Sequence, residues 1–165
     1  MHIDVLERYW LIAVGVTLGT FTAALLAGIF IFGLRTPSPV GRIDPTMIDQ
    51  TEFAETGLRD MGNNRYEVYM LAQMWSFRPS EITVPAGAEV TFFVTSQDIS
   101  HGFMVEDHDI NVMLLPGQIA RATTFFDEPG TYHIICHEYC GPGHHNMYAT
   151  IIVEPATTAD ADTTK

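Results

Sequence analysis

Residues 136–147 read CHEYCGPGHHNM, and they hold both cysteines of the chain, a histidine four residues after the second cysteine, and a methionine three residues further on. Thiolate, imidazole and thioether donors are the ligand set that copper selects, whereas Mg²⁺ and Ca²⁺ select oxygen. Two thiolates separated by three residues can both lean inward and share their sulfurs between two metal ions. His101, in the segment DISHGF at residues 98–103, is the expected source of a further imidazole. The stretch therefore predicts a dinuclear copper site for electron transfer.

Three other chemistries compete with this interpretation. Two extracytoplasmic cysteines often form a disulfide, but a disulfide leaves His144 and Met147 unexplained. Zinc rarely binds a thioether, and its cysteines usually occur as pairs joined by further cysteines or histidines. A mononuclear blue-copper site needs one cysteine, two histidines and a weak axial methionine, so the second cysteine would have no role. The spacing of the donors favours the dinuclear site over all three.

The residues on both sides of this stretch alternate with the period of a β-strand. Apolar residues recur at every second position in several runs, and Pro–Gly turns at 85–87, 116–117 and 129–130 separate some of them. This pattern is typical of half-buried strands in a β-sandwich. A loop between two such strands is well placed to hold ligands, because the sheets are rigid. The alternating positions are Val68, Met70 and Ala72; Ile82 and Val84; Val90, Phe92 and Val94; Tyr132, Ile134 and Cys136; and Met147, Ala149, Ile151 and Val153.

The N-terminal segment has a different composition. Residues 9–34 contain no charged side chain, and at about 1.5 Å per residue they can cross a hydrocarbon core of about 30 Å. A cleaved signal peptide would have a basic n-region and a shorter apolar run. We therefore predict a membrane anchor at 1–35, a connector at 36–64, a β-domain at 65–155 and a disordered acidic tail at 156–165. A short helix is predicted within the connector, between Met47 and Leu58.

The charge of the chain excludes one class of partner. Asp and Glu total 20 against 8 basic residues, giving a net charge of −12, which argues against binding to nucleic acid. An acidic surface can attract a basic redox partner or reflect adaptation to high salt, and the single lysine favours the second explanation. For the membrane orientation, Arg8 precedes the apolar run and Arg35 and Arg42 follow it. The positive-inside rule thus leans, by one residue, towards a cytoplasmic C-terminus.

The motif C-x-x-x-C-x-x-x-H-x-x-M, preceded by D-x-x-H and a Pro–Gly turn, resembles subunit II of haem–copper cytochrome c oxidases. The resemblance is to the short form with one anchor helix, typical of B-type oxidases, and covers roughly residues 66–154. It implies an all-β, cupredoxin-like Greek-key sandwich that carries a mixed-valence CuA centre of two copper ions. In that centre the two cysteines bridge the copper ions and each histidine binds one of them. The implied ligands are Cys136, Cys140, His101, His144, Met147 and the main-chain carbonyl of Glu138.

The resemblance also implies a role. The subunit would accept electrons from cytochrome c or a small blue-copper protein outside the plasma membrane and pass them to the haem of a catalytic subunit. That subunit reduces oxygen to water and pumps protons, and this chain would have no oxygen-reducing site. Residues 74–77, MWSF, resemble the aromatic stretch that receives electrons, so Trp75 is the implied point where electrons enter. Met113 stands where long-form relatives have the acidic residue that joins Glu138 in a magnesium site, so that site is not expected.

Three rival functions stay open at this point. Nitrous-oxide reductase carries the same centre but adds a propeller domain, for which this chain is too short. A membrane-tethered electron carrier or copper-trafficking module would need no catalytic partner. A quinol oxidase subunit keeps the fold but loses the copper ligands, whereas the ligand set here is intact.

Overall fold

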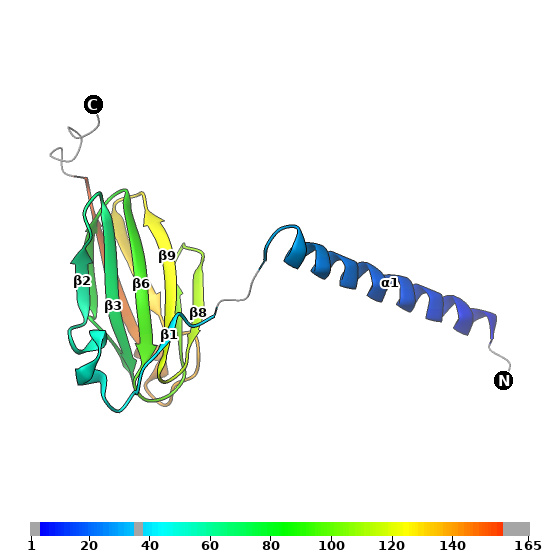
Figure 1. Cartoon of the computed structure of the whole chain (residues 1–165), viewed down its shortest axis with the longest axis horizontal. Helices are drawn as coiled ribbons and strands as arrows, with labels where there is room; N and C mark the ends of the chain where they lie inside the picture. Colours follow the sequence, from blue (N-terminus) through cyan, green and yellow to red (C-terminus); the bar gives the residue numbers. More distant parts are fainter. Residues whose placement is uncertain (1–3, 35–37, 157–165) are drawn as a thin grey trace. The chain divides into compact units, whose positions relative to one another are not determined.

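The computed structural model describes residues 4–34 and 38–156. The chain divides into two compact units, residues 1–37 and 38–165, which we describe separately (Figure 1). Residues 1–3, 35–37 and 157–165 lie outside the described residues, and they include nearly all of the tail predicted to be disordered.

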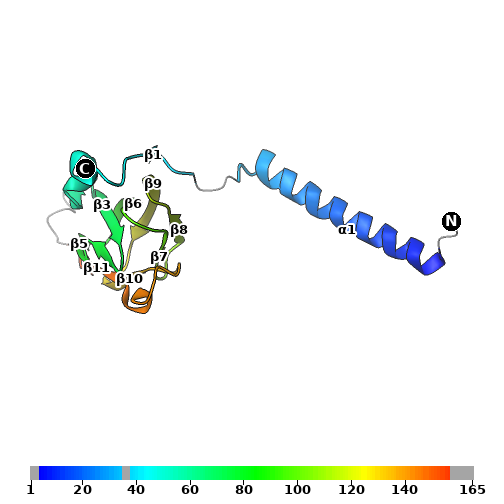
Figure 2. The same cartoon turned by 90° about the horizontal axis from the view of Figure 1, so that it is seen from below.

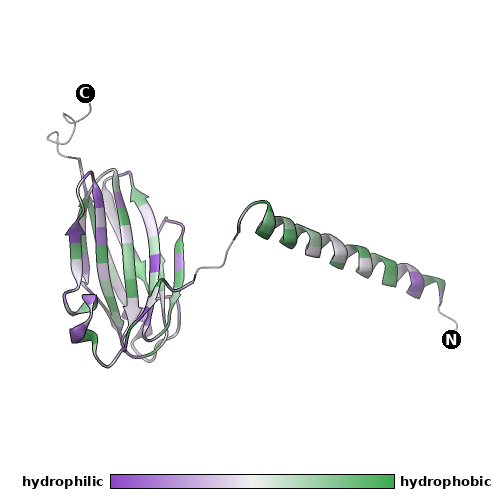
Figure 3. Cartoon of the chain, viewed as in Figure 1, coloured by the Kyte–Doolittle hydropathy of each residue, from purple (hydrophilic) through white to green (hydrophobic). Residues whose placement is uncertain are grey.

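The first unit is the single helix α1 (Val5–Phe30). Asp4 caps its N-terminus, where the side chain accepts a hydrogen bond of 2.8 Å from the main-chain N–H of Leu6. The helix is apolar over most of its length (Figure 3), and its 26 residues correspond to about 39 Å. Its large apolar side chains are exposed on every side, as expected of a helix surrounded by lipid. The helix is thus long and apolar enough to cross a membrane, as predicted.

The second unit is a β-sandwich of two sheets within residues 38–156, seen along the strands in Figure 2. The first sheet has the order β1-β9-β6-β3-β2, with β4 paired to β3. The second has the order β5-β11-β10-β7-β8. The pairs β3–β6 and β5–β11 are parallel and the others are antiparallel. The predicted cupredoxin-like sandwich with one N-terminal helix is confirmed. The strands are β1 (Gly41–Arg42), β2 (Gly57–Asp60), β3 (Arg65–Gln73), β4 (Ser76–Arg78), β5 (Glu81–Pro85), β6 (Ala88–Ser96), β7 (His101–Val105), β8 (Ile110–Leu114), β9 (Gln118–Phe126), β10 (Gly130–Ile135) and β11 (Tyr148–Glu154).

The core lies between the two sheets and is built from the alternating positions of the strands. All of the predicted inward positions are buried except Tyr132, which is half-buried and packs against the core. Phe92 lies at the centre, with its ring 5.5 Å from that of Phe103 and 6.5 Å from that of Phe126. Because Phe92 belongs to the first sheet and Phe103 to the second, this contact joins the layers.

Residues 38–64 contribute more than a connection. They form β1, β2 and two single-turn 3₁₀ helices, η1 (Ile48–Gln50) and η2 (Glu52–Ala54), instead of the one short helix predicted there. Thr51 ends the first turn and caps the second, where its hydroxyl accepts a hydrogen bond of 3.2 Å from the N–H of Phe53. Phe53 is buried against Leu71, and its ring lies 5.7 Å from that of Tyr69. This aromatic anchor, rather than helical periodicity, fixes the segment on the outer face of the first sheet.

We expect Phe92→Ala to destabilise the domain by about 3–5 kcal/mol, because it removes a fully buried ring and leaves a cavity between the sheets. Phe125→Ala is the matched control, since Phe125, on the neighbouring strand β9, is 56% exposed. Its effect should stay within about 0.5 kcal/mol. Denaturant unfolding of both variants, followed by circular dichroism, measures the difference. Equal destabilisation by the two substitutions would contradict this account of the core.

Candidate metal centre

Three neighbouring strands of the second sheet bring the cysteine-rich loop and His101 together. The loop, residues 136–147, joins β10 to β11, whose pair Ile135–Tyr148 closes its base. The N–H of Cys136 also donates a hydrogen bond of 3.2 Å to the carbonyl of Met147. Strand β7, which begins with His101, pairs with the other edge of β10. Pairing across the sheet thus places His101 beside a loop 35 residues away in sequence.

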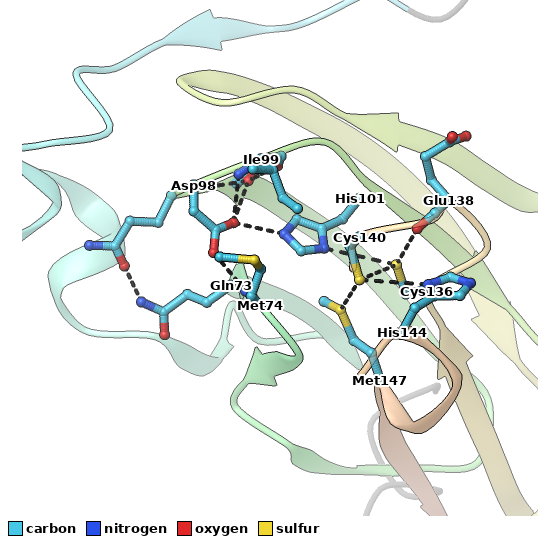
Figure 4. Close-up of polar contacts among 12 residues, drawn as sticks. Gln73, Met74, Asp98, Ile99, His101, Cys136, Glu138, Cys140, His144 and Met147 are labelled. Atoms are coloured by element: carbon cyan, nitrogen blue, oxygen red, sulfur yellow. Dashed lines mark hydrogen bonds and ion pairs between the residues drawn. The ribbon is translucent and has the colours of Figure 1, made fainter. Parts of the chain in front are cut away.

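The two thiols and the two predicted histidines converge at the end of the sandwich (Figure 4). The Sγ atoms of Cys136 and Cys140 lie 3.8 Å apart, and both cysteines are free. Nδ1 of His101 is 3.9 Å from Sγ of Cys136. Nδ1 of His144 is 3.6 Å from Sγ of Cys140. Each sulfur therefore has one imidazole nitrogen beside it, a nearly symmetrical arrangement.

The remaining two predicted donors lie at opposite sides of the pair of sulfurs. Sδ of Met147 is 3.5 Å from Sγ of Cys140. The main-chain carbonyl oxygen of Glu138 is 3.2 Å from Sγ of Cys136. All six predicted ligands are thus brought together.

Most of the cluster is buried, and this affects its acid–base chemistry. His101, both cysteines and Met147 are buried. Burial, together with the adjacent Cys136, raises the pKa of the Cys140 thiol to about 11. At neutral pH this thiol keeps its proton in the metal-free protein. A soft metal ion must therefore displace the proton as it binds.

Asp98 orients His101, a role that the sequence reasoning did not assign. Its Oδ1 atom accepts a hydrogen bond of 2.8 Å from Nε2 of His101, so the Nδ1 lone pair is directed at the sulfurs. The carboxylate also accepts hydrogen bonds of 2.7 Å from the N–H groups of Met74 and Ile99. Partial burial opposes ionisation, but the hydrogen bonds from His101, Met74 and Ile99 outweigh it and keep the pKa of Asp98 below its usual value. The spacing D-x-x-H was the available signal for this pair.

We expect Asp98→Ala to weaken copper binding by about 10–100-fold, because His101 loses the partner that fixes its ring and tautomer. Asp98→Asn should recover part of this loss, since its amide oxygen can still accept the hydrogen bond from Nε2. Competition with a copper chelator measures the affinity. If Ala and Asn weakened binding equally, the hydrogen bond to His101 would not be the cause.

Trp75 lies directly on the loop. It precedes β4, and 45% of its surface is exposed, so it is not a core residue. A Cβ atom placed on Gly143 would lie 2.6 Å from Cγ of Trp75, a distance that side chains do not tolerate. Only glycine at position 143 allows the indole to approach the backbone of the loop so closely.

Within the described residues, the histidines that were not predicted to bind metal have other surroundings. His145, next to His144, is exposed, and its Nε2 lies 3.0 Å from the side-chain nitrogen of Asn146. His137, between the cysteines, is exposed and packs on Gly102. His108 bonds to the carbonyl oxygens of Glu106 and Phe125. His133 pairs with the carboxylate of Glu106.

The donor set fits copper. Two thiols, two imidazoles, a thioether and one carbonyl oxygen meet in a buried cluster whose members need no rearrangement to face one another. Soft donors of this kind select copper over hard cations, and the thioether argues against zinc.

Comparison with known proteins agrees with this chemistry. Residues 47–156 match the family described as cytochrome c oxidase subunit II, periplasmic domain. The chain is similar to cytochrome c oxidase subunit 2 of Thermus thermophilus, with 41% identity over 141 residues that cover 84% of this chain and 98% of the relative. It also resembles one chain of a haem–copper terminal oxidase dimer solved by cryo-electron microscopy. That match has a TM-score of 0.68 and 34% identity, and it covers 90% of this chain and 99% of the other.

A more distant similarity bears on one rival function. Nitrous-oxide reductase of Stutzerimonas stutzeri is 35% identical over 97 residues, which cover 56% of this chain but only 15% of that enzyme. The similarity is thus confined to a small part of a much longer protein. The match to the oxidase subunit, which covers 84% of this chain and 98% of the relative, is the stronger relation.

Proposed function

The chain belongs to the cytochrome c oxidase subunit II family, a haem–copper oxidase component, and we propose that within the oxidase it is the subunit that takes up electrons at a CuA centre. The observation that carries this proposal is the convergence of six soft or carbonyl donors at one end of the sandwich. The thiol pair is central, because each sulfur already contacts a separate imidazole.

The proposed ligands have distinct roles. Cys136 and Cys140 would share their thiolates between two copper ions, while His101 and His144 would each bind one. Two copper ions joined in this way would accept and release one electron with little change in geometry. Met147 and the carbonyl of Glu138 complete the set, and the weak thioether is suited to tuning the potential. Asp98 orients His101 through its hydrogen bond, and four of the ligands are buried.

Trp75 is the proposed point where electrons enter the domain. Its exposed indole lies against Gly143 of the loop, so one side chain faces both solvent and the ligand-bearing backbone. The donor would be cytochrome c or a small blue-copper protein. The acceptor would be a haem of the catalytic subunit, where oxygen is reduced to water and protons are pumped. We propose that this chain contains no oxygen-reducing site of its own.

The family and the helix together indicate a membrane-anchored subunit with its β-domain outside. The family domain is described as periplasmic, and this outweighs the bias of one arginine towards a cytoplasmic C-terminus. We propose the plasma membrane as the location, with α1 as the single span.

Copper analysis combined with electron paramagnetic resonance of the full chain in detergent tests this function. We expect two copper ions per chain and the hyperfine pattern of one electron shared between two copper nuclei. One copper ion with a localised electron would instead indicate a blue-copper site. A purified protein that binds no copper would overturn the proposal. If no haem-containing subunit co-purified with the chain, a free-standing electron carrier would be favoured instead.

A further inference from the structure

A groove of about 510 Å³ opens on the protein surface beside the metal-binding loop. Strands β10 and β11 form one part of it and the loop forms the other. We call it the loop groove, defined by His133, Ile135, Cys136, His144, His145, Met147 and Tyr148. It is distinct from the surface at Trp75, which does not line it.

The loop groove reaches the proposed metal site from one side. Three proposed ligands, Cys136, His144 and Met147, line it. The other two side-chain ligands, His101 and Cys140, are fully buried and do not. His144 is half-buried, whereas only 3% of Cys136 and 2% of Met147 is exposed, so an ion entering through the groove would meet the His144 imidazole before the sulfurs. Imidazole is a suitable ligand for copper, and the thiolate and thioether donors behind it select Cu(I).

His133 lines the groove on the outer face of β10, whereas Cys136, three residues further along, points into the core. Its Nδ1 atom is 2.9 Å from Oε2 of Glu106. Because a carboxylate only accepts hydrogen bonds, Nδ1 carries the proton and the lone pair is on Nε2. Imidazoles that bind metals usually have such a carboxylate partner on the other nitrogen. The side chain is 42% exposed, so an ion from solvent can reach it.

We propose that the loop groove is the route by which copper reaches the site, and that His133 is its first ligand. The inference rests on the proposed function. Cu(I) binds to Nε2 of His133, with the anionic Glu106 offsetting its charge, and is then transferred by ligand exchange to His144, which lines the same groove, and from there to Cys140, whose Sγ is 3.6 Å from Nδ1 of His144. The thiol proton of Cys140 leaves to solvent as the Cu–S bond forms. No electron is transferred, because copper enters and stays as Cu(I).

The test is the rate of Cu(I) uptake by the reduced, metal-free full chain in detergent, without oxygen. Cu(I) is supplied in dilute acetonitrile, and stopped-flow absorbance follows the thiolate-to-Cu(I) band. We expect His133→Ala to lower the second-order rate constant by about tenfold, equivalent to about 1.4 kcal/mol in activation free energy. The final copper content should equal that of the wild type, because His133 is absent from the completed site.

Two further variants make the test specific. His137→Ala is the matched control, because His137 adjoins Cys136 and is exposed but does not line the groove. It should load at the wild-type rate. Ile135→Trp fills the groove without removing any ligand and should slow loading as His133→Ala does. Wild-type rates in His133→Ala, or equal slowing in His137→Ala, would overturn the loading route. Failure of the wild type to bind copper would instead overturn the proposed function.

Discussion

Cys140→Ser is expected to eliminate the dinuclear centre. Sγ of Cys140 contacts three other donors of the cluster: the sulfur of Cys136, Nδ1 of His144 and the sulfur of Met147. A serine hydroxyl is a hard donor that cannot share its oxygen between two copper ions as a thiolate can. We expect at most one bound copper ion, loss of the shared-electron spectrum and loss of electron uptake from the donor.

Copper content and paramagnetic resonance measure this loss, and two further variants serve for comparison with Cys140→Ser. Cys136→Ser should behave like Cys140→Ser, because the two sulfurs have equivalent surroundings. Met147→Leu is a control with a smaller expected effect. It replaces the weak thioether ligand by an apolar side chain of similar volume, so the variant should keep two copper ions while the reduction potential of the centre shifts. A shared-electron spectrum in either serine variant would show that the cysteines do not bridge the metal ions.

Trp75→Leu is expected to lower the second-order rate of electron uptake by about 30-fold. Exposed tryptophans at the centre of protein interfaces commonly contribute 2 kcal/mol or more to binding, which corresponds to about this factor. Because the indole also lies against Gly143, its removal takes away both a docking contact and the direct path to the loop. Reduction of the copper centre by a reduced donor, followed by stopped-flow absorbance, measures the rate.

The matched control for this prediction is Phe125→Leu. Phe125 is also an exposed aromatic residue, but it lies beside the start of β6, whereas Trp75 follows the end of β3, which pairs with the end of β6. It should leave electron uptake unchanged. The absorbance of the loaded centre should be the same in both variants, which separates a loss of electron transfer from a loss of copper. An unchanged rate in Trp75→Leu would exclude this residue as the point where electrons enter.

The long strands could be predicted from the sequence because their signal is local. Val90, Phe92 and Val94 alternate within one strand, and the period alone indicates which side faces the core. Strand β1, by contrast, has two residues, too few to show a period. It exists because the chain runs along the edge of β9. Strand partners of this kind depend on the tertiary fold and leave no local pattern.

The candidate site likewise has features that could be predicted from the sequence and features that depend on the tertiary fold. The loop ligands could be predicted because their spacing along the chain sets their chemistry. His101 was predicted from its motif, and the pairing of β7 with β10 supplies its position. The support from Asp98 and the contact between Trp75 and Gly143 require coordinates, since each joins segments that the sequence separates. The loop groove is likewise formed by side chains from two strands and a loop.

The closing of the loop by the pair Ile135–Tyr148 has a further consequence. Five of the six proposed donors lie within twelve consecutive residues, and the sandwich supplies only His101. The number of metal ions held is therefore a property of one exchangeable segment and not of the scaffold beneath it. Replacing only this loop between β10 and β11 could therefore convert a sandwich with a histidine at the same place from a one-metal into a two-metal electron carrier, or the reverse.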